Sequence, residues 1–160
     1  MLFYLIVLGN IKGGVSMPKK TVFVQASLKE NFRVDCQAGT HKMVIDQPQA
    51  GGGNNDGPSP LDYILMALAG CIATIGRIVA KQRRIDLKGI EVEVEGDLNT
   101  DFLMGTTDEG RPGFTEFRVN VTVDAPISDK EKEEFIHEVD RRCPISDNIV
   151  NDSKIVFNVK

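Results

Sequence analysis

A nearly unbroken apolar segment, residues 61–75, constrains the fold of this chain more than any other feature. Its only polar side chains are those of Asp62 and Thr74 and the phenol of Tyr63. A helix that is apolar on all sides has no face suited to water, so we predict a helix that is buried on every face. The segment is too short to span a bilayer, which needs about 20 apolar residues, and Arg77 ends it. The sequence therefore predicts a central core helix, and we expect no membrane span.

Clear signals mark both ends of this helix. Ser59 is a favourable N-cap, Pro60 suits the first helical position, and Asp62 stands where the acid of a capping box stands. Basic residues gather at the other end, where they favour a helix C-terminus: Arg77, Lys81, Arg83 and Arg84. We expect the helix to end near residue 85.

The rest of the sequence combines strands with one further long helix. Alternating or β-branched residues predict strands at 21–26, 32–36, 41–46, 90–96, 114–123 and 155–159. A second capping box, Ser128 with Glu131, predicts a helix that ends near Arg142. Glycine and polar residues predict loops at 47–58 and 97–112. Helices mixed with antiparallel strands, without a βαβ rhythm, indicate an α+β fold.

Length and charge limit the classes of function. The chain has 160 residues, enough for one domain with a substantial core, and its net charge is −4 with a pI of about 5.2. An acidic chain of this kind lacks the basic surface that nucleic acids require, so we expect no nucleic-acid partner. The glycine-rich loop at 51–57 also lacks the spacing of a phosphate-binding motif.

Residues 1–16 are expected to be a translated leader, which leaves residues 17–160 as a single domain. Residues 1–8 are apolar but lack the positive start and the cleavage site of a signal peptide. Codons for residues 12–14 (Lys-Gly-Gly) can spell a bacterial ribosome-binding site at a suitable distance from Met17. These features indicate a bacterial protein whose biological start is Met17.

Three cysteines, Cys36, Cys71 and Cys143, are the residues best suited to chemistry. An odd number with no C-x-x-C pair argues against a disulfide scaffold, and the spacing matches no metal template, so we expect no metal. Cys71 lies in the apolar helix, where burial raises a thiol pKa. It is either a small core residue or a nucleophile activated by a basic side chain from elsewhere. Cys143 precedes Pro144, where a short helix could begin and stabilise a thiolate, and is either reactive or structural. We interpret Cys36, at a strand end, as structural.

Asp62 also has two interpretations. It stands nine residues before Cys71, which is about 13 Å along a straight helix and on its opposite side, so the two side chains cannot touch there. Capping needs no such contact. Orienting an arginine would need another segment or another subunit.

Two motifs carry a resemblance to a known family. Residues 57–63 (GPSPLDY) and 67–71 (ALAGC) are similar to the cysteine helix of OsmC/Ohr proteins, and residues 143–146 (CPIS) are similar to their second motif. The likeness extends over about residues 20–160. It implies an OsmC-like α+β fold, in which antiparallel sheets wrap around a buried central helix, and an intertwined homodimer with two active sites at the interface.

The resemblance also implies an activity. Cys71 would reduce an organic hydroperoxide and become a sulfenate, and Cys143 would resolve it as a disulfide that an external dithiol reductant reopens. The family needs no metal, flavin or haem, so we expect no cofactor. In the family, an arginine from the N-terminal strands activates the thiol; Arg33 is the only arginine before Cys71, so the resemblance makes it the candidate for this role. The best-known peroxidases carry a glutamate directly after the motif proline, where this chain has Leu61, and Asp62 follows one position later.

Two other functions fit such a fold. One is a non-catalytic module that binds a hydrophobic small molecule or senses oxidants, and the other is a structural homodimer with inert cysteines. Dithiol-dependent peroxide loss that disappears in Cys71→Ser would identify a peroxidase, whereas the absence of a fast-reacting thiol would identify a structural dimer. Of these three functions we expect the peroxidase, a cytoplasmic thiol-based oxidoreductase of the oxidative stress response.

Overall fold

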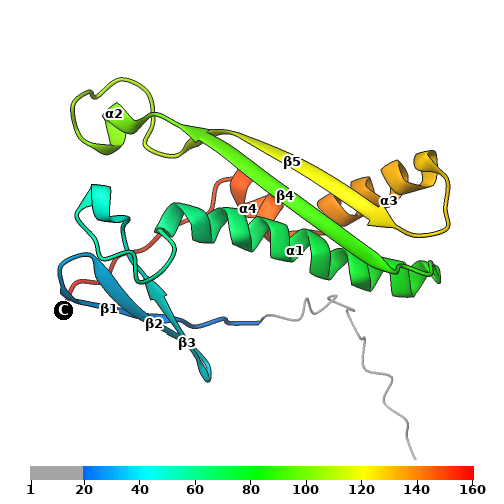
Figure 1. Cartoon of the computed structure of the whole chain (residues 1–160), viewed down its shortest axis with the longest axis horizontal. Coiled ribbons are helices and arrows are strands. Elements are labelled where there is room, and N and C mark those ends of the chain that lie inside the picture. The colour runs from blue at the N-terminus through cyan, green and yellow to red at the C-terminus, as the bar shows by residue number, and fades with distance from the viewer. Residues whose placement is uncertain (1–19) are drawn as a thin grey trace, which may run out of the picture.

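The computed structural model describes residues 20–160, and the leader predicted at 1–16 lies outside that range. In chain order its elements are β1 (Gln25–Glu30), β2 (Arg33–Ala38), β3 (His41–Ile45), η1 (Gln49–Gly51), α1 (Pro60–Arg83), β4 (Gly89–Leu98), α2 (Thr100–Leu103), β5 (Phe114–Asp124), α3 (Asp129–Arg141) and α4 (Pro144–Val150). Figure 1 shows α1 between the sheet formed by the first three strands and the long β4–β5 hairpin.

Two antiparallel sheets are each built from strands that follow one another in sequence. In the first sheet β2 lies between β1 and β3, and a turn with Gly39 at φ 59° joins β2 to β3. In the second sheet β4 pairs with β5 from Gly89 opposite Asp124 to Leu98 opposite Phe114. Helices and antiparallel strands mixed in this order confirm the predicted α+β class.

The core lies between one face of α1, the β4–β5 hairpin and α3. Strand β4 has an apolar face, which packs toward α1, and an acidic face, which is exposed; the apolar residues are Ile90, Val92 and Val94, and the exposed ones are Glu91, Glu93 and Glu95. Gly76 of α1 lets this strand approach closely, because a Cβ there would lie 3.0 Å from Cδ1 of Ile90. From α3, Phe135 and Val139 are completely buried in the same cluster.

Helix α1 is not buried on every face, so that prediction is wrong for the single chain. Leu68 and Ile72 are buried, but Ile64, Met66 and Ile78 are 43%, 47% and 40% exposed. The helix is also longer than the apolar run, at 24 residues, and by length and composition alone it could cross a membrane. Its buried face nevertheless packs on β4 and α3, as a core helix does. Several apolar side chains of α1 thus have no cover among the described residues.

Three segments differ from their predictions. The strand predicted at 21–26 begins only at Gln25, whose partner in β2 is Gln37. The strand predicted at 155–159 does not form, and residues 152–160 have no regular secondary structure. A strand needs a neighbour for its backbone hydrogen bonds, and no described strand pairs with residues 21–24 or with residues 155–159. The loop predicted at 97–112 contains the short helix α2, because Asn99 caps its N-terminus.

Both predicted capping boxes are confirmed. The hydroxyl of Ser59 accepts the backbone N–H of Asp62 at 3.3 Å, and the carboxylate of Asp62 accepts the backbone N–H of Ser59 at 2.8 Å. Ser128 and Glu131 form the same pair of hydrogen bonds at the start of α3. These caps determine where the two long helices begin.

A Ser59→Ala substitution is expected to lower the free energy of unfolding by about 1 kcal/mol, because the first turn of α1 loses its side-chain acceptor. Urea unfolding followed by circular dichroism measures the change. Ser59→Thr keeps the hydroxyl and should unfold near the wild-type midpoint. Equal midpoints for Ser59→Ala and the wild type would contradict a stabilising role of this cap.

Candidate functional site

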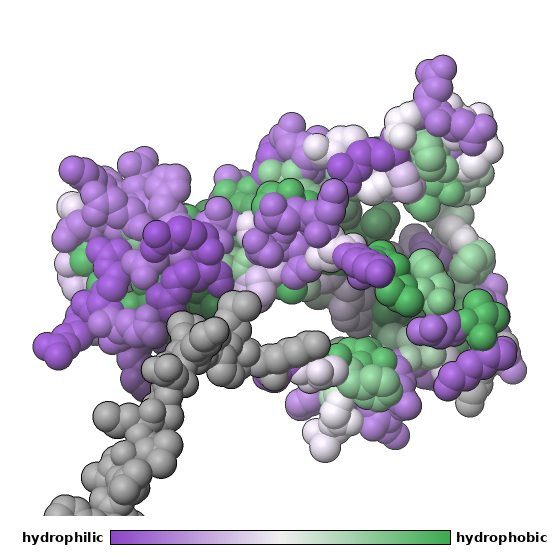
Figure 2. Space-filling model, turned by 180° about the vertical axis from the view of Figure 1, so that it is seen from behind, coloured by the Kyte–Doolittle hydropathy of each residue, from purple (hydrophilic) through white to green (hydrophobic). Residues whose placement is uncertain are grey.

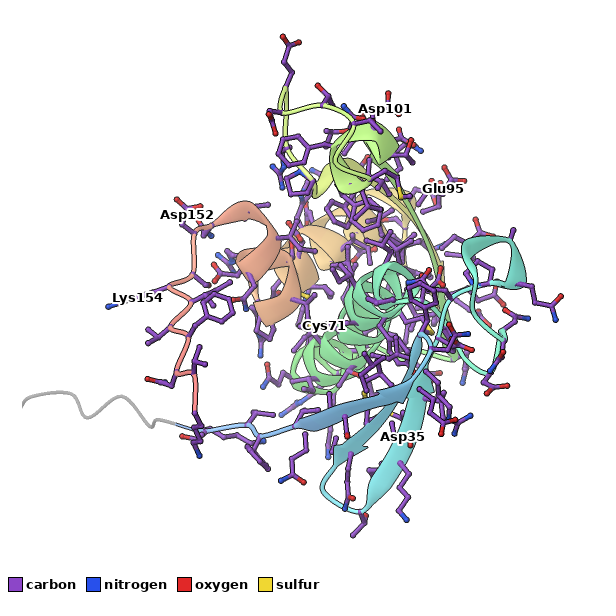
Figure 3. All side chains as sticks on the ribbon, turned by 90° about the vertical axis from the view of Figure 1, so that its left-hand side faces the viewer. Asp35, Cys71, Glu95, Asp101, Asp152 and Lys154 are labelled. Carbon is purple, nitrogen blue, oxygen red and sulfur yellow. The ribbon has the colours of Figure 1, made fainter. Side chains whose placement is uncertain are left out.

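Cys71 and Cys143 lie against each other although 72 residues separate them in sequence. Their Sγ atoms are 2.7 Å apart, and both thiols are free. Cys71 is in the middle of α1 and is partly exposed, whereas Cys143 directly precedes α4 and is 1% exposed. Figure 3 shows Cys71 on the side of α1 that faces α4. Since a disulfide bond is about 2.05 Å long, only a small movement separates these thiols from a covalent bond.

The C-P-x-S sequence fixes the position of Cys143. Pro144 occupies the first turn of α4, which suits a residue without a backbone N–H, and Cys143 is the N-cap. The backbone N–H of Ser146 donates to Cys143 Sγ at 3.4 Å. The hydroxyl of Ser146 donates to the carboxylate of Asp140 at 2.6 Å, and the carbonyl of Asp140 accepts the N–H of Cys143 at 2.9 Å. The end of α3 and the start of α4 therefore hold this thiol from both sides.

Burial raises the pKa of the Cys71 thiol, and the hydrogen bond with Cys143 raises that pKa further. The backbone N–H of Ile145 acts in the opposite direction and lowers the pKa. The net change is upward, so in the single chain Cys71 is a protonated thiol at neutral pH. Because the thiolate is the nucleophile, reactivity at neutral pH requires a positive charge near the sulfur, and no cationic side chain of residues 20–160 is among the groups that change the Cys71 pKa.

A largely apolar cavity of about 530 Å³ lies near the cysteine pair; neither cysteine lines it, and its wall also includes the charged side chains of Arg111, Glu116 and Asp140. Leu68 and Ile72 of α1, which lie on either side of Cys71 in sequence, form part of its wall. Phe117 of β5 and Ile149 of α4 contribute further apolar wall. A cavity of this size and lining fits a small apolar molecule.

Arg33 does not lie beside the cysteine pair in the single chain. Its guanidinium binds the carboxylates of Asp56, at 2.7 Å, and Asp35, at 3.0 Å. Figure 3 shows Asp35 on the three-stranded sheet, apart from Cys71 on α1. Arg33 is also absent from the groups that change the pKa of Cys71. The structure thus brings together two of the four predicted site residues and leaves Arg33 in a different environment.

Asp62 has the capping role that the sequence allowed. Its carboxylate accepts the backbone N–H of Ser59 at 2.8 Å and the Ser59 hydroxyl at 2.7 Å. Within residues 20–160 it forms no ion pair with an arginine. The third cysteine, Cys36, lies on β2 with 8% exposure, and its Sγ is 4.0 Å from the carbonyl oxygen of Val34. It is separate from the cysteine pair, in agreement with a structural role.

A buried carboxylate, Asp46, was not singled out from the sequence. It follows β3, is 1% exposed, and accepts three backbone N–H groups, from Gln47 at 2.8 Å and from Asn54 and Asp56 at 3.0 Å. These hydrogen bonds lower its pKa, with the one from Asp56 as the largest cause. The sequence did carry a signal for this feature, because the acidic residues Asp46 and Asp56 flank the glycine-rich part of the loop.

Asp46→Asn is expected to change how stability depends on pH. Because the pKa of Asp46 is lower in the folded chain than the ordinary value of about 3.9, its contribution to stability is complete above that value and is lost as the pH falls through the folded pKa. The variant should therefore melt well below the wild type at pH 7, and the difference should shrink below about pH 4. Thermal melts at both pH values measure this. A difference that stays constant with pH would contradict the assignment.

Comparison with known proteins gives the relatives of this fold. A family model described as OsmC-like protein matches residues 52–159, more than half of the chain. A hydroperoxide reductase of Mycoplasma pneumoniae (strain ATCC 29342 / M129 / Subtype 1) is 27% identical over 103 residues, which are 64% of this chain and 70% of that protein. The crystal structure of an OsmC-like protein from Mycoplasma pneumoniae superposes with a TM-score of 0.72 at 23% identity, over 82% of this chain and 89% of that one. An organic hydroperoxide resistance protein OsmC from Legionella pneumophila gives a TM-score of 0.58 at 22% identity, over 84% and 92% of the two chains.

Proposed function

Because the chain belongs to the OsmC-like protein family, we propose that it is a thiol peroxidase that reduces organic hydroperoxides without a cofactor. The observation that carries the proposal is the contact between Cys71 and Cys143, whose sulfurs are 2.7 Å apart. Two thiols at this distance can be oxidised together, whereas a lone thiol would need a second molecule to complete the reaction. The similarity to a hydroperoxide reductase supports the choice of substrate class.

The proposed reaction has three steps. The Cys71 thiolate attacks the terminal oxygen of the hydroperoxide, the O–O bond breaks, and the alcohol leaves with a proton while Cys71 becomes a sulfenic acid. The Cys143 thiol then attacks the sulfenic sulfur, which forms the disulfide and releases water. An external dithiol reduces the disulfide by exchange and is itself oxidised to a disulfide. Cys71 is the attacking thiol because it is partly exposed, whereas Cys143 is buried.

We further propose that the active form is an intertwined homodimer. Ile64, Cys71 and Ile78 recur every seven residues, so they lie on nearly the same line along α1, and both isoleucines are at least 40% exposed. The C-terminal segment adds exposed apolar side chains: Ile155, Val156, Phe157 and Val159. Figure 2 shows apolar residues on the surface and around a hollow, where a single compact domain would place polar ones. Exposed apolar surface of this extent marks an interface, and a second copy would also give the unpaired segments a partner strand.

A second copy would also supply the positive charge that the thiol lacks. Arg33 is the proposed source, since it belongs to the N-terminal sheet and is not near Cys71 within its own chain. A guanidinium beside the sulfur would lower the pKa that burial raises. The apolar cavity of about 530 Å³ is the proposed place for the organic part of the hydroperoxide. We place the protein in the cytoplasm, where dithiol reductants keep both cysteines reduced.

Peroxide consumption in the presence of a dithiol tests this function. The wild type is expected to consume cumene hydroperoxide when dihydrolipoamide is present, and Cys71→Ser is expected to show only the uncatalysed rate. Cys36→Ser is the matched control, because it removes a thiol outside the pair and should keep full activity. Equal rates for Cys71→Ser and the wild type would refute the proposal.

The apolar cavity favours a second function, a non-catalytic module that binds a hydrophobic molecule. Such a module would bind an alkyl alcohol or a fatty acid without consuming peroxide. Calorimetry with the redox-inactive alcohol of the same hydroperoxide, run beside the peroxide assay, separates the two functions. Binding without peroxide loss would identify the module.

A further inference from the structure

We propose that Asp56 positions the guanidinium of Arg33 for the thiol reaction, and that the buried carboxylate of Asp46 holds Asp56 in place. This inference rests on the proposed peroxidase function and names the residue that takes the orienting role in this chain. Asp56 acts through Arg33 and is therefore a positioning residue, not a catalytic one.

Two carboxylates hold Arg33, and they differ in what they can fix. The guanidinium donates from Nη1 to Asp56 Oδ2 at 2.7 Å, and from Nε and Nη2 to Asp35 Oδ1 at 3.2 and 3.0 Å. Asp35 is two residues further along the same strand, so it lies on the same face of β2 as Arg33 in any strand. Asp56 is 23 residues from Arg33, so only the folded loop brings it there. Asp56 can therefore fix the guanidinium relative to the loop and to α1. Asp35 belongs to the same strand as Arg33 and can fix it only relative to that strand.

The loop that carries Asp56 is built around Asp46. One oxygen of the Asp46 carboxylate accepts the backbone N–H groups of both Asn54 and Asp56, each at 3.0 Å. The backbone is packed tightly at the loop glycines: a Cβ on Gly53 would lie 2.1 Å from the carbonyl oxygen of Gln47. A side chain at Gly53 would thus force the loop to shift, and with it Asp56.

The same loop leads directly into the helix that carries Cys71. Asp56 precedes the N-cap Ser59 by three residues, and the carbonyl oxygen of Pro58 accepts the N–H of Asp46 at 3.2 Å. Arg33 is therefore tied through Asp56 to the start of α1. Its direction is set relative to that helix and not only by its own strand.

Asp62, the acidic residue in the first turn of α1, is already used by the helix cap and does not orient Arg33. Asp62 accepts two hydrogen bonds from Ser59, and the position before it is Leu61, which has no acceptor. The orienting role that one interpretation gave to Asp62 is thus assigned to the loop carboxylate six residues earlier. In the single chain Asp62 serves the helix cap.

Removing Asp56 distinguishes two roles for this carboxylate, positioning the Arg33 guanidinium or only neutralising its charge. The two roles predict opposite changes in the pKa of Cys71 and in its rate of oxidation. A carboxylate that only neutralised Arg33 would leave a stronger positive charge when removed, so the pKa of Cys71 would fall and its reaction with peroxide would accelerate. A carboxylate that positions Arg33 would leave the guanidinium misdirected, so the pKa would rise and the reaction would slow. We expect Asp56→Ala to slow Cys71 oxidation about tenfold at pH 7, less than the roughly hundredfold that a 1 Å misplacement of a catalytic group can cost.

The experiment compares Asp56→Ala, Asp56→Glu, Asp35→Ala and Arg33→Ala in the full-length dimer. Rates of Cys71 oxidation by cumene hydroperoxide and of Cys71 alkylation by iodoacetamide, read from the Cys71 peptide by mass spectrometry, are measured from pH 5 to 9. Asp56→Ala and Arg33→Ala should move the alkylation profile to higher pH. Asp35→Ala should change the rates less than about twofold, and Asp56→Glu should recover part of the loss, because it restores a carboxylate that reaches the guanidinium.

The outcomes distinguish this inference from the function on which it rests. Faster oxidation in Asp56→Ala, or equal losses in Asp56→Ala and Asp35→Ala, would overturn the positioning role while Cys71-dependent peroxidase activity stands. An Arg33→Ala variant with wild-type rates would overturn it too. Loss of the peroxidase function itself would appear separately, as wild-type activity in Cys71→Ser. Melting temperatures of all variants show whether a slow variant is also unfolded. If Asp56→Ala is unfolded, the rate of Asp56→Glu decides: a rate near that of Arg33→Ala in a folded Asp56→Glu protein would overturn the positioning role.

Discussion

With one equivalent of hydroperoxide per chain, a Cys143→Ser variant is expected to end as a sulfenic acid on Cys71. The wild type should consume the same equivalent and end as the Cys71–Cys143 disulfide. The difference arises because the resolving sulfur lies 2.7 Å from Cys71 and is replaced by a hydroxyl that does not attack a sulfenic acid. In steady state with a dithiol, turnover should fall by at least about a hundredfold, because an intramolecular step becomes a bimolecular one.

The substitution is expected to keep the local structure. Cys143 is the N-cap of α4, where its sulfur accepts the backbone N–H of Ser146, and serine is a better N-cap acceptor than cysteine. Loss of turnover would therefore not reflect an unravelled α4. Circular dichroism of the two proteins should be indistinguishable.

Intact-protein mass spectrometry identifies the products without a reductant. The variant should gain about 16 Da and bind dimedone, and a second equivalent of peroxide should carry it to the sulfinic acid. The wild type should lose two hydrogens and resist the second equivalent. Cys36→Ser provides the control, since it should behave as the wild type. A Cys143→Ser variant that still reaches a disulfide, through Cys36 or a second chain, would show that Cys143 is not the resolving thiol.

Features that depend on local sequence were predictable. The capping boxes of Ser59 with Asp62 and of Ser128 with Glu131 are formed by residues three positions apart, so the starts of α1 and α3 follow from the sequence alone. The alternation of valines and glutamates in β4 likewise determines which face of that strand packs on α1. The OsmC/Ohr resemblance is confirmed, because the family model and the superposed structures agree with it.

Features that depend on distant contacts were not predictable from the residues alone. Arg33 contacts Asp56, which is 23 residues away in sequence, and the buried carboxylate of Asp46 accepts the backbone N–H of Asp56 in the loop between them. The composition of that loop indicated an irregular segment but not which of its polar residues turn inward. The exposed apolar face of α1 was predicted as buried, because hydrophobicity indicates that a face needs cover and does not say which chain supplies it.

A lysine on the exposed apolar line of α1 is expected to break the proposed dimer. The wild type should elute at twice the 17.6 kDa mass of the chain, whereas Ile78→Lys should elute as a single chain at micromolar concentration. Ile78 is 40% exposed in the single chain, so a lysine there can reach water without disturbing the buried core of Leu68, Ile72 and Val79. In a dimer the same ammonium group would lie in an apolar contact, where an unpaired charge costs several kcal/mol.

The same variant should lose most of its peroxidase activity, because burial raises the pKa of Cys71 in the single chain, no arginine is among the groups that lower that pKa, and Arg33 is paired with Asp56. Asn120→Lys is the matched control: it adds the same charge to the exposed outer face of β5, opposite Glu93, and should remain dimeric and active. Light scattering after gel filtration measures the mass, and the dithiol-linked assay measures the activity. A monomeric wild type with full activity, or a monomeric Ile78→Lys with full activity, would show that one chain completes the site, and Arg33 could then not be the group that activates Cys71.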